Sequence, residues 1–166
     1  MNLILAGGLG GAVLLFLASR TQQGAAMVDR LATPRGIRNN NPGNIDWIAT
    51  PAKRWNGMVR KETKAEGGRF AVFDTPANGV RAIGQELLLD ARRGVRTIEG
   101  LINAWAPDNE NDTAAYIAAV GYKLKVEPDQ AIDVLSWLPR LVEAIIEHEN
   151  GQQPYSSSDI TRWVYS

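Results

Sequence analysis

The 166-residue sequence predicts a mainly helical α+β domain with a small β-hairpin lobe, preceded by an N-terminal hydrophobic helix. Apolar residues recur at helical spacing in several segments between residues 75 and 150. Segments 55–59 and 69–73 are short, aromatic and β-prone, and residues 3–18 form an apolar run. We therefore divide the chain into an anchor at 1–20, a tether at 21–33, a folded domain at 34–155 and a C-terminal tail at 156–166.

The N-terminal run from Leu3 to Ala18 contains only apolar residues and glycine. A helix that crosses a bilayer needs about 20 such residues, so this run is slightly short. A signal peptide normally begins with Lys or Arg, and none precedes Leu3. We therefore predict a retained membrane anchor through residues 3–18, with a signal peptide cleaved near Gly24 as the alternative.

The segment from Gly36 to Ile45 reads Gly-Ile-Arg-Asn-Asn-Asn-Pro-Gly-Asn-Ile. Asn tolerates left-handed backbone, Pro fixes φ and Gly accepts positive φ, so we predict a rigid polar loop. Amides both donate and accept hydrogen bonds, which suits a neutral ligand such as a sugar. A purely structural turn cluster is the alternative. The candidate substrate-binding residues of this loop are Asn39, Asn40, Asn41 and Asn44.

The two β-prone segments predict a hairpin whose tip runs from Arg60 to Gly68. Glu62 and Glu66 lie on that tip, where a carboxylate could stabilise positive charge on a sugar or position a water molecule. A solvated charged loop is the alternative for both. Trp55, in the first segment, and Trp105, which lies two residues before Pro107, are candidate sugar platforms, although most tryptophans serve in packing.

Capping and stop residues delimit four helices after the hairpin. The first begins at Thr75-Pro76 and ends at Gly94. The second begins at Thr97 and stops at Pro107, and the third begins at Asp112 or Thr113. The last helix runs from about Ser136 to Glu149 and ends at Gly151.

Composition excludes several kinds of site. The chain has 18 Lys and Arg against 18 Asp and Glu, so it lacks the basic excess of a nucleic-acid-binding protein. It has no cysteine, which excludes disulfides and thiol nucleophiles. His148 is the one histidine, which excludes a multi-histidine metal site. An enzyme of this composition is expected to use carboxylates, with no metal and no cofactor.

Glu149 is the carboxylate in the most informative position. It lies three residues after Ile146 and four after Ile145, so it continues the apolar face of the last helix. Apolar neighbours and the negative end of the helix dipole both disfavour a charged carboxylate there. A carboxylic acid that stays protonated is what protonation of a glycosidic oxygen requires. A Glu that turns to solvent or pairs with an arginine is the alternative.

Two stretches resemble cell-wall lytic enzymes. Residues 144–151, Ala-Ile-Ile-Glu-His-Glu-Asn-Gly, resemble the end of the catalytic-Glu helix of soluble lytic transglycosylases and goose-type lysozymes. Residues 40–88 resemble bacterial glucosaminidase autolysins, through the Asn loop, Trp55-Asn56-Gly57, the charged tip and the strand that begins at Phe70. From Arg35 to Tyr155 the chain is similar to a virion-associated peptidoglycan lysin domain of phages, of the lysozyme-like superfamily. Because the Glu-bearing helix comes last here, that fold is expected in permuted order.

The resemblance implies roles for several residues. Glu149 is the expected catalytic acid, with Glu62 or Glu66 as a second carboxylate. Glu110, in Glu-Asn-Asp-Thr, binds sugar or caps a helix, and Tyr116 binds sugar or packs in the core. His148 and Asn150, on either side of Glu149, are candidate substrate-binding residues, and His148 is expected to orient a neighbouring group.

The predicted function is a peptidoglycan lytic transglycosylase, or muramidase, that cleaves the bond between N-acetylmuramic acid and N-acetylglucosamine. Its expected partners are glycan strands, a lipid membrane and other virion proteins, at the virion membrane or the host cell envelope. Two alternatives stay open: a non-catalytic structural or peptidoglycan-binding virion protein, and a murein endopeptidase.

Overall fold

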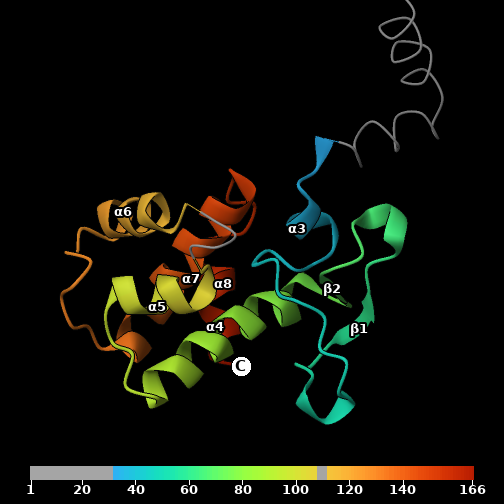
Figure 1. Cartoon of the computed structure of the whole chain (residues 1–166), viewed down its shortest axis with the longest axis horizontal. Helices are drawn as coiled ribbons and strands as arrows, with labels where there is room; N and C mark the ends of the chain where they lie inside the picture. Colours follow the sequence, from blue (N-terminus) through green and yellow to red (C-terminus); the bar gives the residue numbers. More distant parts are fainter. Residues whose placement is uncertain (1–31, 108–111) are drawn as a thin grey trace, which may run out of the picture. The chain divides into compact units, whose positions relative to one another are not determined.

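Six helices and a two-stranded sheet make up the part of the chain that this computed structural model describes, residues 32–107 and 112–166 (Figure 1). The predicted mainly helical α+β class is confirmed. Residues 35–166 form one compact unit. Its elements are α3 (Arg35–Arg38), η1 (Pro51–Lys53), β1 (Met58–Lys61), η2 (Lys64–Glu66), β2 (Ala71–Phe73), α4 (Pro76–Arg92), α5 (Ile98–Trp105), α6 (Thr113–Leu124), α7 (Val134–Asn150) and α8 (Ser157–Val164).

The expected anchor at residues 3–18 lies outside the described residues. Across residues 32–107 and 112–166, no helix is both long enough and apolar enough to cross a bilayer.

Side-chain caps begin three of the helices at the predicted residues. The Thr75 and Thr97 hydroxyls accept hydrogen bonds from the backbone N–H groups of Asn78 (3.3 Å) and Gly100 (3.1 Å). The Asp112 carboxylate accepts one from the Ala115 N–H at 3.1 Å. Each cap satisfies a backbone donor that the first helical turn leaves unpaired. The starts of α4, α5 and α6 are therefore confirmed.

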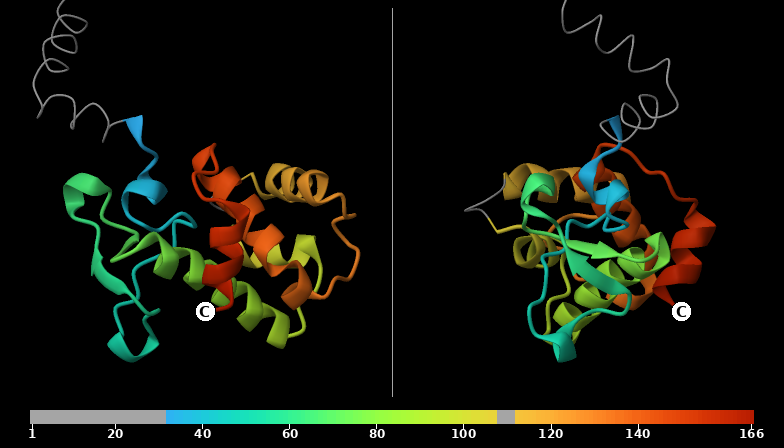
Figure 2. Two further views of the ribbon diagram at one scale, coloured as in Figure 1. Left: turned by 180° about the vertical axis from the view of Figure 1, so that it is seen from behind. Right: turned by 90° about the vertical axis from the view of Figure 1, so that its right-hand side faces the viewer.

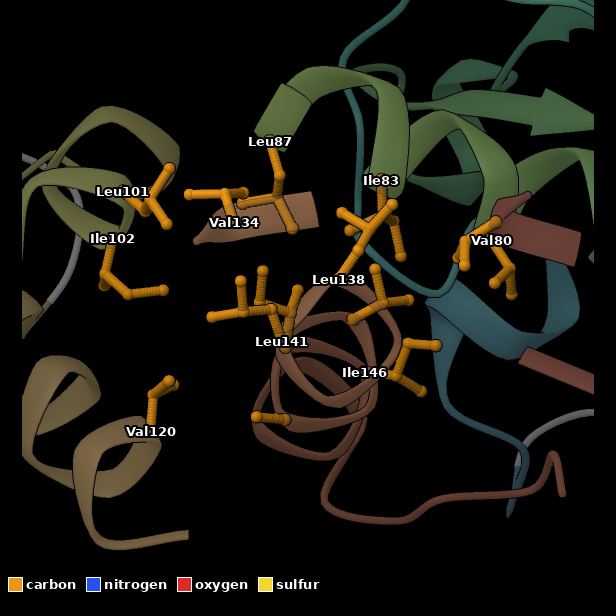
Figure 3. Packing of buried hydrophobic residues seen from close by; sticks show 14 of the residues in the cluster. Val80, Ile83, Leu87, Leu101, Ile102, Val120, Val134, Leu138, Leu141 and Ile146 are labelled. Atoms are coloured by element: carbon orange, nitrogen blue, oxygen red, sulfur yellow. The ribbon is translucent and has the colours of Figure 1, made fainter. Parts of the chain in front are cut away.

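Helix α7 lies at the centre of the unit and packs against α4, α6 and α8. Figure 3 shows side chains of α4, α5, α6 and α7 meeting in one core, with Leu138 and Leu141 of α7 among them. Both leucines are fully buried, and burial of each stabilises the fold by about 1.5–3 kcal/mol. The core therefore holds the far end of α7, which carries Glu149, in a fixed place.

The hairpin and α6 lie on opposite sides of α7 (Figure 2). Strands β1 and β2 are antiparallel, with Met58 opposite Phe73. The Asn-rich loop runs along the other edge of β2, because the N–H groups of Ala71 and Phe73 donate to the carbonyls of Ile45 (2.9 Å) and Asn39 (3.0 Å). These backbone hydrogen bonds attach the loop to the sheet.

The segment expected to be a tail, residues 156–166, contains α8. This helix packs against α4 and α7, and its Ile160 is fully buried. Pro139 inside α7 has no N–H, so the Leu135 carbonyl loses its usual helical partner. The Tyr165 hydroxyl, just after α8, donates to that carbonyl at 2.8 Å. The folded unit therefore continues beyond residue 155.

Candidate active site

Glu149 lies in the last turn of α7 and lines a cleft of about 270 Å³ between the helical core and the hairpin lobe. The walls come from segments far apart in the sequence: the Asn-rich loop, the start of β2, α4 and the end of α5. The lining residues are Gly43, Asn44, Ile45, Asp46, Arg69, Phe70, Glu86, Asp90, Ala104, Trp105, Ala106 and Glu149.

Three neutral side chains donate hydrogen bonds to the half-buried Glu149 carboxylate. Asn44 Nδ2 donates to Oε2 at 2.9 Å. Trp105 Nε1 and the Tyr116 hydroxyl donate to Oε1, each at 3.2 Å. Because the donors come from the loop, α5 and α6, the carboxylate has one defined orientation at the cleft.

Gly43 and Asn44 owe their positions to backbone features that the Asn-rich loop provides. A Cβ on Gly43 would lie 2.7 Å from Ile83 Cγ1 and 2.8 Å from Trp105 Cζ2, so only glycine fits between α4 and the indole. Asn44 has a left-handed φ of 50°, which Asn adopts more readily than most residues. Together they direct the Asn44 amide at Glu149.

Tyr116 joins Glu149 to His148. Its ring is buried and stacks on the His148 imidazole, with ring centroids 3.5 Å apart and planes 13° from parallel. Burial, followed by the negative charge of Glu149, raises the pKa of the Tyr116 hydroxyl well above its usual range, so it remains a donor. Burial lowers the pKa of His148, against an opposing effect of Glu149.

Three of the four candidate asparagines do not line the cleft, and their amides are used inside the fold. Asn41 is fully buried and donates to the carbonyls of Ile45 and Ala71, each at 2.9 Å. Asn40 donates to the Phe73 carbonyl at 3.1 Å, and Asn39 to Glu62 at 2.7 Å. The structural alternative therefore accounts for Asn39, Asn40 and Asn41, and Asn44 alone of the four lines the cleft.

Glu62 is buried, contrary to the expectation of an exposed hairpin tip. Its carboxylate accepts hydrogen bonds from Asn39 Nδ2 (2.7 Å) and from the Phe70 N–H (3.1 Å). Arg35 Nε lies 3.8 Å away. A carboxylate satisfied in this way joins the Asn-rich loop to the hairpin, and it is not part of the cleft lining.

Glu66 remains on the hairpin tip, also outside the cleft lining. It pairs with Arg60 at 2.8 Å and forms a capping box with Thr63. The hydrogen bond from Arg60, with those from Thr63, lowers the pKa of Glu66 to about 2. The two predicted catalytic carboxylates of the hairpin are therefore not brought together with Glu149.

The remaining candidates lie near the cleft or outside the described residues. Trp55 Nε1 donates to Glu86 at 3.1 Å, and burial raises the pKa of that cleft carboxylate. Asn150 Nδ2 donates to the Pro42 carbonyl at 2.7 Å and so fastens the loop to α7. Glu110 falls in residues 108–111, which the structure does not describe.

Over 151 residues the chain is 34% identical to Protein P5 of Pseudoalteromonas phage PM2, an alignment that covers 89% of this chain and 92% of that protein. The chain belongs to the family of PM2 Protein P5. No protein-family model matches it. A phage relative agrees with the phage origin that the sequence resemblance implied.

In this member of the P5 family, the contacts of Trp105 with Glu149 were not predicted. The sequence marked Trp105 only as a sugar platform, at the end of an amphipathic helix before Pro107. The cleft also contains an ion pair between Asp46 and Arg69 at 2.7 Å, which no motif indicated. Within residues 32–107 and 112–166, no group of three or more His, Asp or Glu side chains could hold a metal ion.

Proposed function

We propose that this protein is a peptidoglycan lytic transglycosylase of the lysozyme-like superfamily, with Glu149 as its catalytic acid and base. The observation that carries the proposal is the Glu149 carboxyl group, held by Asn44, Trp105 and Tyr116 at an open cleft. A general acid must be held within hydrogen-bond reach of the group that it protonates. The indole of Trp105 and the ring of Phe70 also line the cleft and suit a sugar face.

The reaction begins when protonated Glu149 gives its proton to the glycosidic oxygen between N-acetylmuramic acid and N-acetylglucosamine. The bond from C1 to that oxygen breaks, and positive charge develops on the muramic ring. The Glu149 carboxylate then takes the proton of the muramic C6 hydroxyl while O6 bonds to C1. The products are a 1,6-anhydro end and a free hydroxyl, and Glu149 is again protonated.

The anhydro route is favoured over hydrolysis because the other carboxylates are already bound by groups of the protein. Glycosidases that use water normally need a second carboxylate at a defined separation from the acid. Glu62 and Glu66 are bound within the hairpin lobe. The other cleft carboxylates each have a protein partner: Asp46 has Arg69, Glu86 has Trp55 and Asp90 has Arg93.

The arrangement of elements is consistent with a permuted lysozyme-like fold. A loop and hairpin form one wall of the cleft, and the helix that ends in the acid follows them in the chain. In the proposed setting, residues 3–18 anchor the protein in the virion membrane or host envelope. The domain then opens the glycan strands locally for cell-wall penetration.

The deciding experiment is mass spectrometry of the products released from purified peptidoglycan by the full chain and its Glu149→Gln variant. Glu147→Gln is the matched control, because Glu147 is exposed on the same helix and pairs with Lys123. Anhydromuramic ends from the wild type and the control, but not from Glu149→Gln, are the expected result.

Other product patterns would contradict the proposal in distinct ways. Reducing muramic ends would make the protein a hydrolase, and free peptide ends would make it a murein endopeptidase. Tight binding without any product would identify a structural or peptidoglycan-binding virion protein.

A further inference from the structure

The NH₂ group of the Asn44 amide donates a hydrogen bond, whereas its oxygen accepts none from the described residues. Its Nδ2 donates to Glu149 Oε2, whereas its Oδ1 is buried on the other side. Among the residues that the structure describes, none donates a hydrogen bond to this oxygen. A buried acceptor left without a donor destabilises the fold, so its position calls for a reason.

Asn150 Oδ1 is a second buried oxygen, and likewise nothing in residues 32–107 or 112–166 donates to it. The Asn150 amide group cannot turn over to give this oxygen a donor, because its Nδ2 donates to the carbonyls of Pro42 (2.7 Å) and Ile146 (2.8 Å). A Cβ on Gly36 would lie 2.5 Å from Asn150 Oδ1 and 3.1 Å from Asn44 Oδ1. The two oxygens therefore face the same point beside Gly36.

Turning over the Asn44 amide exchanges an oxygen and an NH₂ group of nearly the same shape. The NH₂ group would then face the point beside Gly36, toward which Asn150 Oδ1, an acceptor without a donor in the described chain, also points. Asn44 Oδ1 would face Glu149 Oε2. Two oxygens at hydrogen-bond distance attract only if one carries a proton, so this second orientation requires protonated Glu149.

We propose that Asn44 is a positioning residue whose amide turns over as Glu149 gains or loses its proton. The proposal rests on the proposed acid and base role of Glu149, in which the proton leaves and returns within one turnover. In the ionised state Asn44 donates to Oε2. In the protonated state Oε2–H donates to Asn44 Oδ1, and the Asn44 NH₂ group donates to Asn150 Oδ1. Both buried oxygens then have a hydrogen-bond donor.

The other titratable and charged groups near Glu149 do not alternate between donating a hydrogen bond to Oε2 and accepting one from it. Tyr116 from α6 and Trp105 from α5 donate to Oε1, not to Oε2. His148 stacks on Tyr116. The cleft walls contribute Asp46, Arg69, Glu86 and Asp90. In the described chain, Asn44 is the side chain that contacts Oε2 and can both donate and accept.

The test is NMR spectroscopy of the full chain labelled with ¹⁵N-asparagine and ¹³C-glutamate, followed across pH. The expected result is that the Asn44 side-chain NH₂ signal and the Glu149 carboxyl carbon shift with the same midpoint. On the acid side, the Asn44 NH₂ gains a nuclear Overhauser contact with the Gly36 α-protons.

The Glu149→Gln variant should show that contact at every pH. Trp105 can only donate, so it holds the carbonyl oxygen of the introduced Gln at the Oε1 position. The Gln NH₂ then faces Asn44 and requires its oxygen. An Asn44 NH₂ whose contacts do not change with pH, or do not differ in Glu149→Gln, would overturn the proposal.

A kinetic test uses Asn44→Gly, because glycine keeps the left-handed backbone and removes the amide. Lys125→Gly is the matched control, since Lys125 has a left-handed φ of 57° away from the cleft. The initial rate on peptidoglycan should fall about 10- to 100-fold in Asn44→Gly and stay unchanged in the control. A rate unchanged in Asn44→Gly would contradict the positioning role. An inactive wild type that still shows the NMR exchange would refute the enzymatic function and leave the coupling intact.

Discussion

Glu149 differs from Asp46, Glu62 and Glu66 in the chemistry of its partners. Glu66 and Asp46 pair with arginines, and Glu62 has an arginine nearby. Glu149 is held by an amide, an indole and a phenol. These neutral groups orient the carboxyl without adding a charge beside it. At the scale of single residues, its neighbours therefore act chiefly through geometry.

The first prediction at this scale concerns Tyr116. Tyr116→Phe removes one donor from Glu149 but keeps the ring that stacks on His148. The rate on peptidoglycan should fall about tenfold or more, because a hydrogen bond to a charged group is worth about 1.5–3 kcal/mol. Thermal unfolding, compared with the wild type, should show that the variant is folded. An unchanged rate would mean that Tyr116 only packs.

A second prediction concerns pH. Because burial lowers the pKa of His148 in the folded state, this imidazole binds fewer protons in the folded than in the unfolded chain between its lowered pKa and about pH 6.5. The free energy of unfolding should therefore decrease as pH falls from about 6.5 through the lowered pKa. Urea unfolding at several pH values should show a shallower decrease in His148→Gln. The same pH dependence of the free energy of unfolding in both proteins would show that His148 is not its cause.

At the scale of elements, the contact between α4 and the Asn-rich loop depends on one glycine. A Cβ on Gly79 would lie 1.8 Å from the Asn40 carbonyl oxygen. Gly79→Ala should therefore destabilise the fold by about 3 kcal/mol, because backbone must move.

The control for this prediction is Gly84→Ala on the same helix. There the nearest atoms are side-chain carbons of Val164 at 3.4 Å, and Ala is a better helix former by about 0.5–1 kcal/mol. The melting temperature should fall in the first variant and stay level or rise in the second. Equal melting temperatures of the two variants would show that the Asn-rich loop can move away from α4 without loss of stability.

The hairpin supplies another prediction. Glu62→Gln should destabilise the fold by about 2 kcal/mol, because an NH₂ group would face one of the N–H donors that now bind the carboxylate. Activity per folded molecule should be retained. A variant that is as stable as the wild type but inactive would instead support the catalytic role once expected of Glu62.

Local chemistry explains which elements could be predicted. The starts of α4, α5 and α6 follow from Thr75, Thr97 and Asp112, whose partners lie three residues away. The role of Asn41 could not be predicted in this way, because one acceptor of its amide is the Ala71 carbonyl, thirty residues along the chain. The same holds for Glu62, whose burial depends on Asn39.

At the scale of the whole molecule, α8 completes the core. Ile160 is fully buried in the segment expected to be a tail, so Ile160→Ala should cost about 2–5 kcal/mol. Thr161→Ala, at an exposed position of the same helix, should stay within about 0.5 kcal/mol. Urea unfolding of both variants measures the difference. A small effect of Ile160→Ala would mean that α8 is dispensable.

The candidate site was predictable only in part, because its residues come from elements far apart in the chain. Glu149 was identifiable because its position on the apolar face of α7 depends on residues three and four before it. Asn44, Tyr116 and Trp105 were candidate site residues, but their contact with Glu149 was not predicted, since helix periodicity says nothing of which distant side chain will meet it. Trp105 and Tyr116 lie on two other helices, and Asn44 lies on a loop.

The order of the elements along the chain has a consequence for biosynthesis. Asn44 precedes Glu149 by 105 residues, and α8, which packs on α7, follows both. A protein leaves the ribosome from its N-terminus onward, so the loop and hairpin emerge well before the helix that bears the acid. Translation that stops before α7 therefore yields fragments without the proposed catalytic group. Under the proposed function, the cell that makes this chain is spared wall-cleaving fragments until the last helices are in place.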